Sequence, residues 1–127
     1  MRIAHVALWT RDIIAASSFW QQYFNAEIGP MYRSNRRPGF ESCFVQLPNG
    51  DVQIELMTGP WPESRHSDEC IGWDHIAVAV GSAEAVDALA ERCRIDGLLV
   101  SAPRKTGDGF YEAVVSAPDG TRVEITT

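Results

Sequence analysis

His-Val-Ala-Leu at residues 5–8 returns as His-Ile-Ala-Val at residues 75–78, and this repetition decides the fold. Two further segments repeat in the same order: Leu-Pro-Asn-Gly (47–50) before Val-Gln-Ile-Glu (52–55), and Ala-Pro-Asp-Gly (117–120) before Arg-Val-Glu-Ile (122–125). The histidines of the two copies are 70 residues apart and the glutamates are 69 apart, so the second copy is one residue shorter between these two positions. An internal repeat of this length indicates a duplicated supersecondary unit.

Each copy predicts a strand, a helix and three further strands. Asp12 and Ser82 occupy N-cap positions before an apolar stripe of helical period, and Gly97 is expected to end the second helix. The Pro48-Asn49-Gly50 and Pro118-Asp119-Gly120 turns predict hairpins. The expected strands are 2–9, 26–33, 40–47 and 52–58 in the first copy, and 73–80, 98–103, 110–117 and 121–127 in the second. The chain, 1–127, therefore reads as one domain with a first module at 1–58, a linker at 59–72 and a second module at 73–127.

Composition excludes several classes of protein. A net charge of −6 argues against nucleic acid or anionic lipid as the main partner. No apolar run approaches the roughly 20 residues of a membrane span, and no secretory signal is apparent, so a soluble cytoplasmic protein is expected. The single lysine, Lys105, leaves little scope for Schiff-base chemistry, and no serine-hydrolase or P-loop motif occurs. The cysteines (Cys43, Cys70 and Cys93) lack CxxC spacing and are expected to be free thiols, Cys93 in the core.

Two histidines and two glutamates occupy equivalent strands of the two copies. Side chains alternate along a strand, and the immediate neighbours of all four residues are mostly apolar. The apolar side chains therefore face the helix-covered core, and His5, Glu55, His75 and Glu124 face the other way. Singly, each has an ordinary explanation, such as a hydrogen-bonded histidine or a solvated glutamate. Together, two imidazoles and two carboxylates suit a divalent cation such as Zn, Ni, Co, Fe or Mn.

These features resemble the vicinal oxygen chelate superfamily, which includes glyoxalase I, bleomycin resistance proteins and extradiol dioxygenases. The resemblance covers nearly the whole chain and rests on the paired βαβββ modules, the Pro-x-Gly turn before each last strand, and the His…Glu…His…Glu order. It implies an α+β fold in which two paired βαβββ modules form a curved mixed sheet around a metal site. It also implies a homodimer with sites at the subunit interface. Bacterial glyoxalase I carries the same ligand order as His5, Glu55, His75 and Glu124.

The resemblance implies a metal-dependent lyase or isomerase of the glyoxalase I (lactoylglutathione lyase) type. One divalent metal per site, with Zn, Ni or Co favoured and Mn or Fe as alternatives, would chelate adjacent oxygens of a 2-oxoaldehyde–thiol adduct. Proton transfer would pass through a metal-bound enediolate, with Glu124 as base and Glu55 as its partner across the metal. The alternatives are another metalloenzyme of the superfamily (an epimerase, a dioxygenase or an antibiotic thiol transferase) and a binding protein for a small ligand or antibiotic.

The sequence indicates the substrate less clearly than it indicates the metal site. Bacterial glyoxalase I holds glutathione with an Arg and an Asn at positions that match Trp9 and Gly59 here, so glutathione itself is in question. Arg11, Arg33, Arg36 or Arg37 could bind an anionic group instead, and each is also explained as a solvated surface charge. Trp9, Arg36, Arg37 and Tyr111 are the expected substrate residues, with Trp73 and Phe110 as further candidates for an apolar wall. The irregular segment 34–39 and the glycine-rich segment 106–109 are loops, the second a candidate lid.

Overall fold

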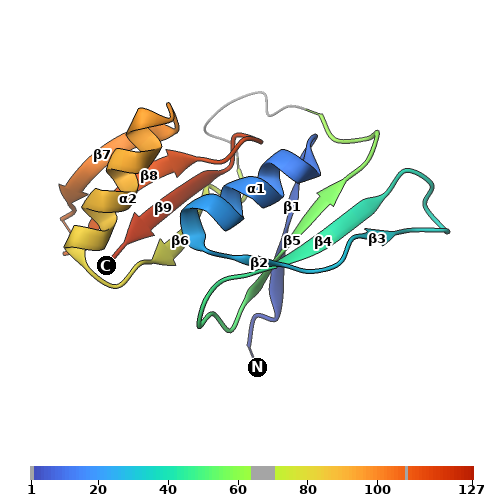
Figure 1. The fold of residues 1–127 in the computed structure, drawn as a ribbon, viewed down its shortest axis with the longest axis horizontal. Helices are drawn as coiled ribbons and strands as arrows, with labels where there is room; N and C mark the ends of the chain where they lie inside the picture. The colour runs from blue at the N-terminus through green and yellow to red at the C-terminus, as the bar shows by residue number, and fades with distance from the viewer. Residues whose placement is uncertain (1, 64–70, 108) are drawn as a thin grey trace. The chain divides into compact units, whose positions relative to one another are not determined.

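A computed structural model describes residues 2–63, 71–107 and 109–127 of the chain. The chain divides into two compact units, Met1–Arg65 (unit 1) and His66–Thr127 (unit 2). Unit 1 contains β1 (His5–Trp9), α1 (Ile13–Phe24), β2 (Glu27–Ile28), β3 (Tyr32–Arg33), β4 (Glu41–Gln46) and β5 (Gln53–Thr58) (Figure 1). Unit 2 contains β6 (His75–Ala79), α2 (Ala83–Ile95), β7 (Leu99–Lys105), β8 (Tyr111–Ser116) and β9 (Arg122–Thr126). The predicted α+β fold with two βαβββ modules is confirmed.

Each unit forms its own mixed sheet. In unit 1 the order is β1-β5-β4-β2, with β3 also paired to β4, and in unit 2 the order is β6-β9-β8-β7. The first strand of each unit pairs parallel with the last one, and the other pairs are antiparallel. The first and last strands are the two that carry the repeated histidine and glutamate, so the topology makes them neighbours within each unit.

The expected continuous strand at 26–33 is wrong in one respect, because the structure has two short strands there. β2 and β3 both pair with β4, and residues 29–31 separate them. The break falls at Pro30, which has no backbone N–H to donate to a sheet. Gly29 still donates its N–H to the Phe44 carbonyl at 2.8 Å, so the segment stays against β4 on both sides of the break.

The helices begin and end where the sequence predicts. The Asp12 carboxylate accepts hydrogen bonds from the backbone N–H groups of Ile14 and Ala15, and the Ser82 hydroxyl accepts one from Ala85. Gly97 ends α2 with a positive φ of 74°. There the N–H of Gly97 bonds the Arg94 carbonyl and that of Leu98 bonds the Cys93 carbonyl, the paired bonds of a Schellman motif.

A helix covers one face of the sheet in each unit. α1 packs on β2, β4 and β5, and α2 packs on β7, β8 and β9 (Figure 1). Cys43 and Cys93 are buried free thiols, and burial raises the pKa of Cys93 to about 11. Cys70 and His66 lie outside the described residues. No helix in the described part of the chain is long and apolar enough to cross a membrane. Further large side chains of the core are Trp20, Leu56, Ile125, Val45, Val86, Val115 and Val123.

The slip of one residue between the copies lies in the last hairpin of each unit. The β4–β5 loop spans residues 47–52 and the β8–β9 loop spans 117–121, one residue fewer. Both loops close with the same backbone bond, from Gly50 to the Leu47 carbonyl and from Gly120 to the Ala117 carbonyl. The extra residue therefore sits beyond the turn, and the strand registers are preserved: Ala7 pairs with Glu55 as Ala77 pairs with Glu124.

Candidate metal centre

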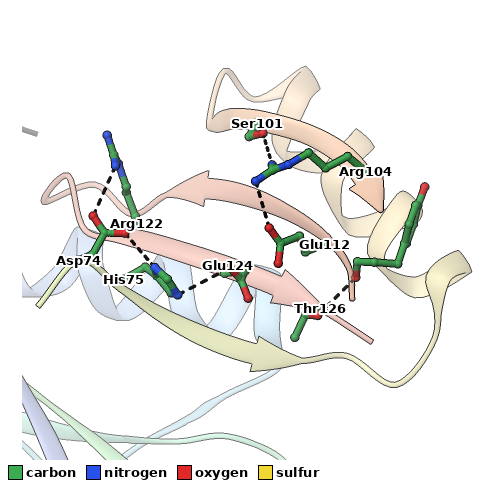
Figure 2. Close-up of polar contacts among 9 residues, drawn as sticks. Asp74, His75, Ser101, Arg104, Glu112, Arg122, Glu124 and Thr126 are labelled. Atoms are coloured by element: carbon green, nitrogen blue, oxygen red, sulfur yellow. Dashed lines mark hydrogen bonds and ion pairs between the residues drawn. The ribbon is translucent and has the colours of Figure 1, made fainter. Parts of the chain in front are cut away.

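The second His–Glu pair, His75 and Glu124, lies on the face of the unit 2 sheet that α2 leaves open (Figure 2). His75 is at the start of β6, and Glu124 is in the middle of the neighbouring strand β9. Their side chains point toward each other, with His75 Nε2 at 3.6 Å from Glu124 Oε2. Val123 and Ile125, on either side of Glu124, are fully buried, as strand alternation predicts.

Asp74 orients the His75 ring. Asp74 Oδ2 lies 2.8 Å from His75 Nδ1, and Asp74 Oδ1 lies 3.5 Å from Arg122 Nη1 (Figure 2). An ionised carboxylate only accepts hydrogen bonds, so Nδ1 carries the hydrogen in this contact. In the neutral ring, Nε2 then presents its lone pair toward Glu124. A carboxylate behind a histidine is the usual way to fix an imidazole that binds a metal through its other nitrogen.

A second carboxylate flanks Glu124. Glu112 on β8 is buried, and its Oε1 accepts a 3.0 Å hydrogen bond from Arg104 Nη2, while Arg104 Nη1 donates to Ser101 Oγ (Figure 2). Burial raises the pKa of Glu124, and the charge of Glu112 and a hydrogen bond with it raise this pKa further. His75 and Arg104 act in the opposite direction. A carboxyl with a raised pKa holds and releases a proton more readily near neutral pH.

The first His–Glu pair, His5 and Glu55, repeats this arrangement in unit 1 with different neighbours. His5 Nε2 lies 3.9 Å from Glu55 Oε2, and the Glu55 side chain is 18% exposed, as is that of Glu124. The His5 ring packs edge-to-face on Phe44, with centroids 5.6 Å apart. Ala4 precedes His5, where Asp74 precedes His75. The first pair is therefore braced by an aromatic ring, and the second by charged groups.

Both pairs have spacings that suit two ligands of one ion. Ligand atoms about 2.1 Å from a cation are separated by no more than about 4.2 Å, and the two N–O distances are 3.9 and 3.6 Å. These distances are too long for direct hydrogen bonds. Among the described residues, no group of three or more His, Cys, Asp or Glu side chains gathers that could hold a metal ion. Each unit therefore brings together one imidazole nitrogen and one carboxylate.

The other expected site residues lie in three different places. Trp9 is on the same face of β1 as His5, and the guanidinium of Arg37 lies 5.5 Å from the centre of its ring. Arg36 is exposed. Tyr111 lies on the helix-covered face, where its hydroxyl donates to Asp87 at 2.7 Å, and this hydrogen bond is the main cause of its raised pKa. The Tyr111 hydroxyl is therefore directed away from Glu124. Arg33 pairs with Glu41 at 2.6 Å.

Several side chains that shape these surroundings are not apparent from the sequence alone. Asp74 carries a local signal, because it directly precedes the histidine. Glu112 and Arg104 meet only through the pairing of β7 with β8, which contains register shifts between Leu99 and Arg104. Trp61 stacks on Arg37 from beyond the end of β5, with 3.9 Å between the guanidinium carbon and the ring centre. These contacts depend on strand register and loop path, which residue spacing does not specify.

Two βαβββ units with a His–Glu pair at the same strand positions define a duplicated fold. The chain matches the family model described as Glyoxalase/Bleomycin resistance protein/Dioxygenase superfamily over residues 2–125, and it belongs to this superfamily. It is also 32% identical over 106 residues to uncharacterized protein PA2024 of Pseudomonas aeruginosa, a match that covers 80% of this chain and 70% of the relative.

Solved structures share the fold at low sequence identity. A glyoxalase/bleomycin resistance protein/dioxygenase domain from Frankia sp. EAN1pec superposes with a TM-score of 0.84 at 18% identity, covering 99% of this chain and 96% of the other. A glyoxalase I variant from Zea mays gives 0.79 at 19% identity, over 98% of this chain and 44% of the maize chain. The fosfomycin resistance protein FosX from Listeria monocytogenes, complexed with Mn(II) and sulfate, gives 0.74 at 20% identity, over 99% and 91%. These likenesses establish the fold.

Proposed function

We propose that the protein is a divalent-metal-dependent lyase or isomerase of the glyoxalase I type, acting on a small 2-oxoaldehyde–thiol adduct. The observation that carries this proposal is the repeated His–Glu pair, with N–O distances of 3.9 Å in unit 1 and 3.6 Å in unit 2. Both pairs face away from the helices, and both are too widely spaced for a direct hydrogen bond. Superfamily membership supports metal chemistry as well, since the fold is shared with a protein solved in complex with Mn(II).

His5, Glu55, His75 and Glu124 would hold the cation, one pair from each of two units. Nitrogen and carboxylate oxygen donors suit Zn, Ni or Co, with Mn or Fe as alternatives. When bound, the cation supplies positive charge that stabilises the negative charge developing on two adjacent substrate oxygens during proton abstraction. Asp74 keeps the His75 ring in the orientation that directs Nε2 toward the ion, and Phe44 restricts the His5 ring from the side.

Glu124 is the general base of the proposed reaction, and Glu55 would be its partner across the metal. Glu124 removes the proton from the carbon that bears the sulfur and hydroxyl of a hemithioacetal. The same proton returns to the neighbouring carbonyl carbon, while the hydroxyl proton of the hemithioacetal moves to the former carbonyl oxygen. The product is a 2-hydroxyacyl thioester with the same atoms as the substrate. Burial and the neighbouring Glu112 raise the pKa of Glu124, which favours protonation after the first transfer.

Metal counting and turnover together test the proposal. Metal-free protein would be reloaded in turn with Ni, Co, Zn and Mn, and thioester formation would be followed with the methylglyoxal–glutathione hemithioacetal and with adducts of other thiols. We expect one ion per site and metal-dependent turnover that Glu124→Gln abolishes without unfolding the protein. Absence of stoichiometric metal would contradict the site and leave a binding protein as the better account. Oxygen uptake with ferrous protein and a catechol would favour a dioxygenase instead.

Complementation between subunits tests the proposed homodimer with sites at the interface. At limiting metal, chains carrying Glu55→Gln or Glu124→Gln, each impaired alone, would be mixed under conditions that exchange subunits. If each site takes unit 1 from one protomer and unit 2 from its partner, half the sites of a mixed dimer are intact, and activity returns. If each site is built within one chain, every site of the mixed dimer keeps one defect, and activity stays low. We expect recovery.

A further inference from the structure

Arg37 lies among aromatic rings at the far end of the strand that carries His5. Its guanidinium carbon lies 3.9 Å from the centre of the Trp61 ring, 5.5 Å from that of Trp9 and 5.6 Å from that of Phe40. Trp9 and Phe40 contact each other edge-to-face with centroids 6.0 Å apart. We call Trp9, Phe40, Trp61 and Arg37 the aromatic platform. All four belong to unit 1, on β1, the 34–40 loop and the segment after β5.

The platform remains accessible. The Trp9 and Trp61 rings are 40% and 42% exposed, and Arg37 is exposed as well. Adjacent exposed aromatic side chains on a soluble protein mark a surface that binds something. The rings hold the guanidinium by its face, through cation–π contacts. Within the described residues no carboxylate pairs with the Arg37 guanidinium, so its N–H groups can donate to an anionic ligand.

Gly59 is required for this arrangement. A Cβ atom at Gly59 would lie 2.4 Å from Trp61 Cζ3 and 2.6 Å from Cε3, so only glycine lets the indole fold back against this segment. Arg33 pairs with Glu41 instead, and neighbouring Arg36 forms no hydrogen bond or ion pair with the described part of the chain. The neighbouring arginines therefore differ: Arg33 is paired with Glu41, and Arg37 lies over aromatic rings.

Strand alternation relates the platform to the first His–Glu pair. Trp9 is four residues beyond His5 and shares its face, and Met57, opposite Trp9, is two residues beyond Glu55. Four residues along a strand correspond to about 13 Å. An elongated ligand with vicinal oxygens at the His–Glu end would therefore carry its other end over Met57 to the platform. The guanidinium there selects a carboxylate or a similar anionic group.

We propose that Arg37, held by Trp9, Phe40 and Trp61, is a specificity-determining residue that binds an anionic terminus of an elongated substrate, at the end of β1 about 13 Å along the strand from His5. This inference rests on the proposed function for the position of the reacting end. It adds the substrate class: a chain with chelating oxygens at one end and a negative charge at the other. A purely structural Arg37 would brace the loop and would not distinguish a charged terminus from a neutral one.

The test compares chelating probes that differ only at the far end. Alkyl hydroxamates of increasing chain length, ending in a carboxylate or in its methyl ester, would be titrated calorimetrically into metal-loaded and metal-free protein. For wild type we expect the best carboxylate to bind about tenfold more tightly than its ester, because the ionic hydrogen bond is lost in the ester. Arg37→Gln should bring the ratio close to one without changing the affinity for the ester, and Arg37→Lys should retain part of it.

Arg36→Gln is the matched control, since it removes the same charge one residue away and should leave the ratio unchanged. An acid-to-ester ratio near one in wild type, or equal losses in Arg36→Gln and Arg37→Gln, would overturn the proposal. Failure of the proposed function is distinct: the whole series would then bind no more tightly with metal than without it. A preference that persists in metal-free protein and disappears only in Arg37→Gln would support Arg37 even in that case.

Discussion

The two His–Glu pairs have the same backbone frame and opposite surroundings. In unit 1, an aromatic ring, Phe44, packs against His5, and alanine precedes this histidine. In unit 2, Asp74 bonds His75, and Glu112 and Arg104 stand beside Glu124. Phe44 and Val114 occupy the same register position, opposite Glu55 and Glu124, so the difference is one of side chains and not of strand pairing. A duplicated fold can thus keep the same His–Glu pair in both halves while the side chains around each pair differ.

This contrast suggests a division of labour. In unit 2, burial and the charge of Glu112 raise the pKa of Glu124, and Asp74 fixes the His75 tautomer, which suits proton transfer. In unit 1 the neighbouring groups are aromatic rings, Phe44 beside His5 and the aromatic platform at the end of β1, which suits contact with the body of a ligand. Superfamily membership does not require this asymmetry. The asymmetry comes from the side chains that lie two positions away from each histidine or glutamate, or directly across from it on a neighbouring strand.

Replacing each of the two glutamates in turn should give the largest difference between the two units. Glu124→Gln is expected to lower kcat by about 10²–10⁴-fold, the usual contribution of a general base, while Glu55→Gln lowers it less and weakens metal binding instead. Steady-state kinetics at saturating metal would separate the two. Equal losses in kcat from both substitutions would show that the halves share the chemistry and would end the proposed division.

Asp74→Asn should come next in effect. The amide keeps the size of the side chain and removes the charge behind His75, so metal affinity is expected to fall by about 10–100-fold. The mirror change, Ala4→Asp, would offer His5 the partner that unit 1 lacks and should tighten binding or leave it unaltered. Competition with a chelating dye would measure both. If Asp74→Asn bound metal as tightly as wild type, the contact between Asp74 and His75 would have no role in holding the ion.

Much of this architecture could be predicted from the repeat. Apolar alternation in the four strands placed His5, Glu55, His75 and Glu124 on the faces away from the helices, and the caps at Asp12 and Ser82 set the helix starts. The strand expected at 26–33 failed because a single proline outweighed the β-forming residues around it. The side chains around each pair could not be predicted from the sequence, because their positions depend on strand register and on the paths of the loops. Glu112 meets Arg104 across two strands, and Arg37 meets Trp61 through loops whose path no periodicity encodes.

Removing the charge of Glu124 should stabilise the metal-free protein. Because the pKa of Glu124 is raised in the folded state, the folded protein binds this proton more tightly than the unfolded chain does. The stabilisation from this proton is present below the unfolded pKa and is lost as pH rises through the folded pKa. At neutral pH the charge of Glu124 therefore destabilises the folded protein. Glu124→Gln should raise Tm at pH 7 by about 2–4 °C.

Calorimetry in the presence of a chelator would test this, with Glu55→Gln as the control. The two glutamates are equally exposed, at 18%, but Glu124 has Glu112 nearby, and the matching position in unit 1 is occupied by Ser42. We expect the gain in Tm to shrink as pH falls toward the unfolded pKa. A variant less stable than wild type at pH 7 would contradict the electrostatic account of unit 2.

The smallest predicted effect concerns Gly59, which makes the aromatic surface of unit 1 possible. Gly59→Ala places a methyl group 2.4 Å from the Trp61 ring, so the ring must move. Because Trp61 is 42% exposed, it can swing outward at a cost of about 1 kcal/mol or less, and the fold should survive. Without its closest ring, Arg37 loses its fixed orientation, and the preference for carboxylate over ester probes should fall severalfold. Gly107→Ala is the matched control, since its Cβ would meet no atom within 4 Å. If Gly59→Ala kept the full preference while tryptophan fluorescence reported a displaced ring, Trp61 would be dispensable, and the anion site would depend on Trp9 and Phe40 alone.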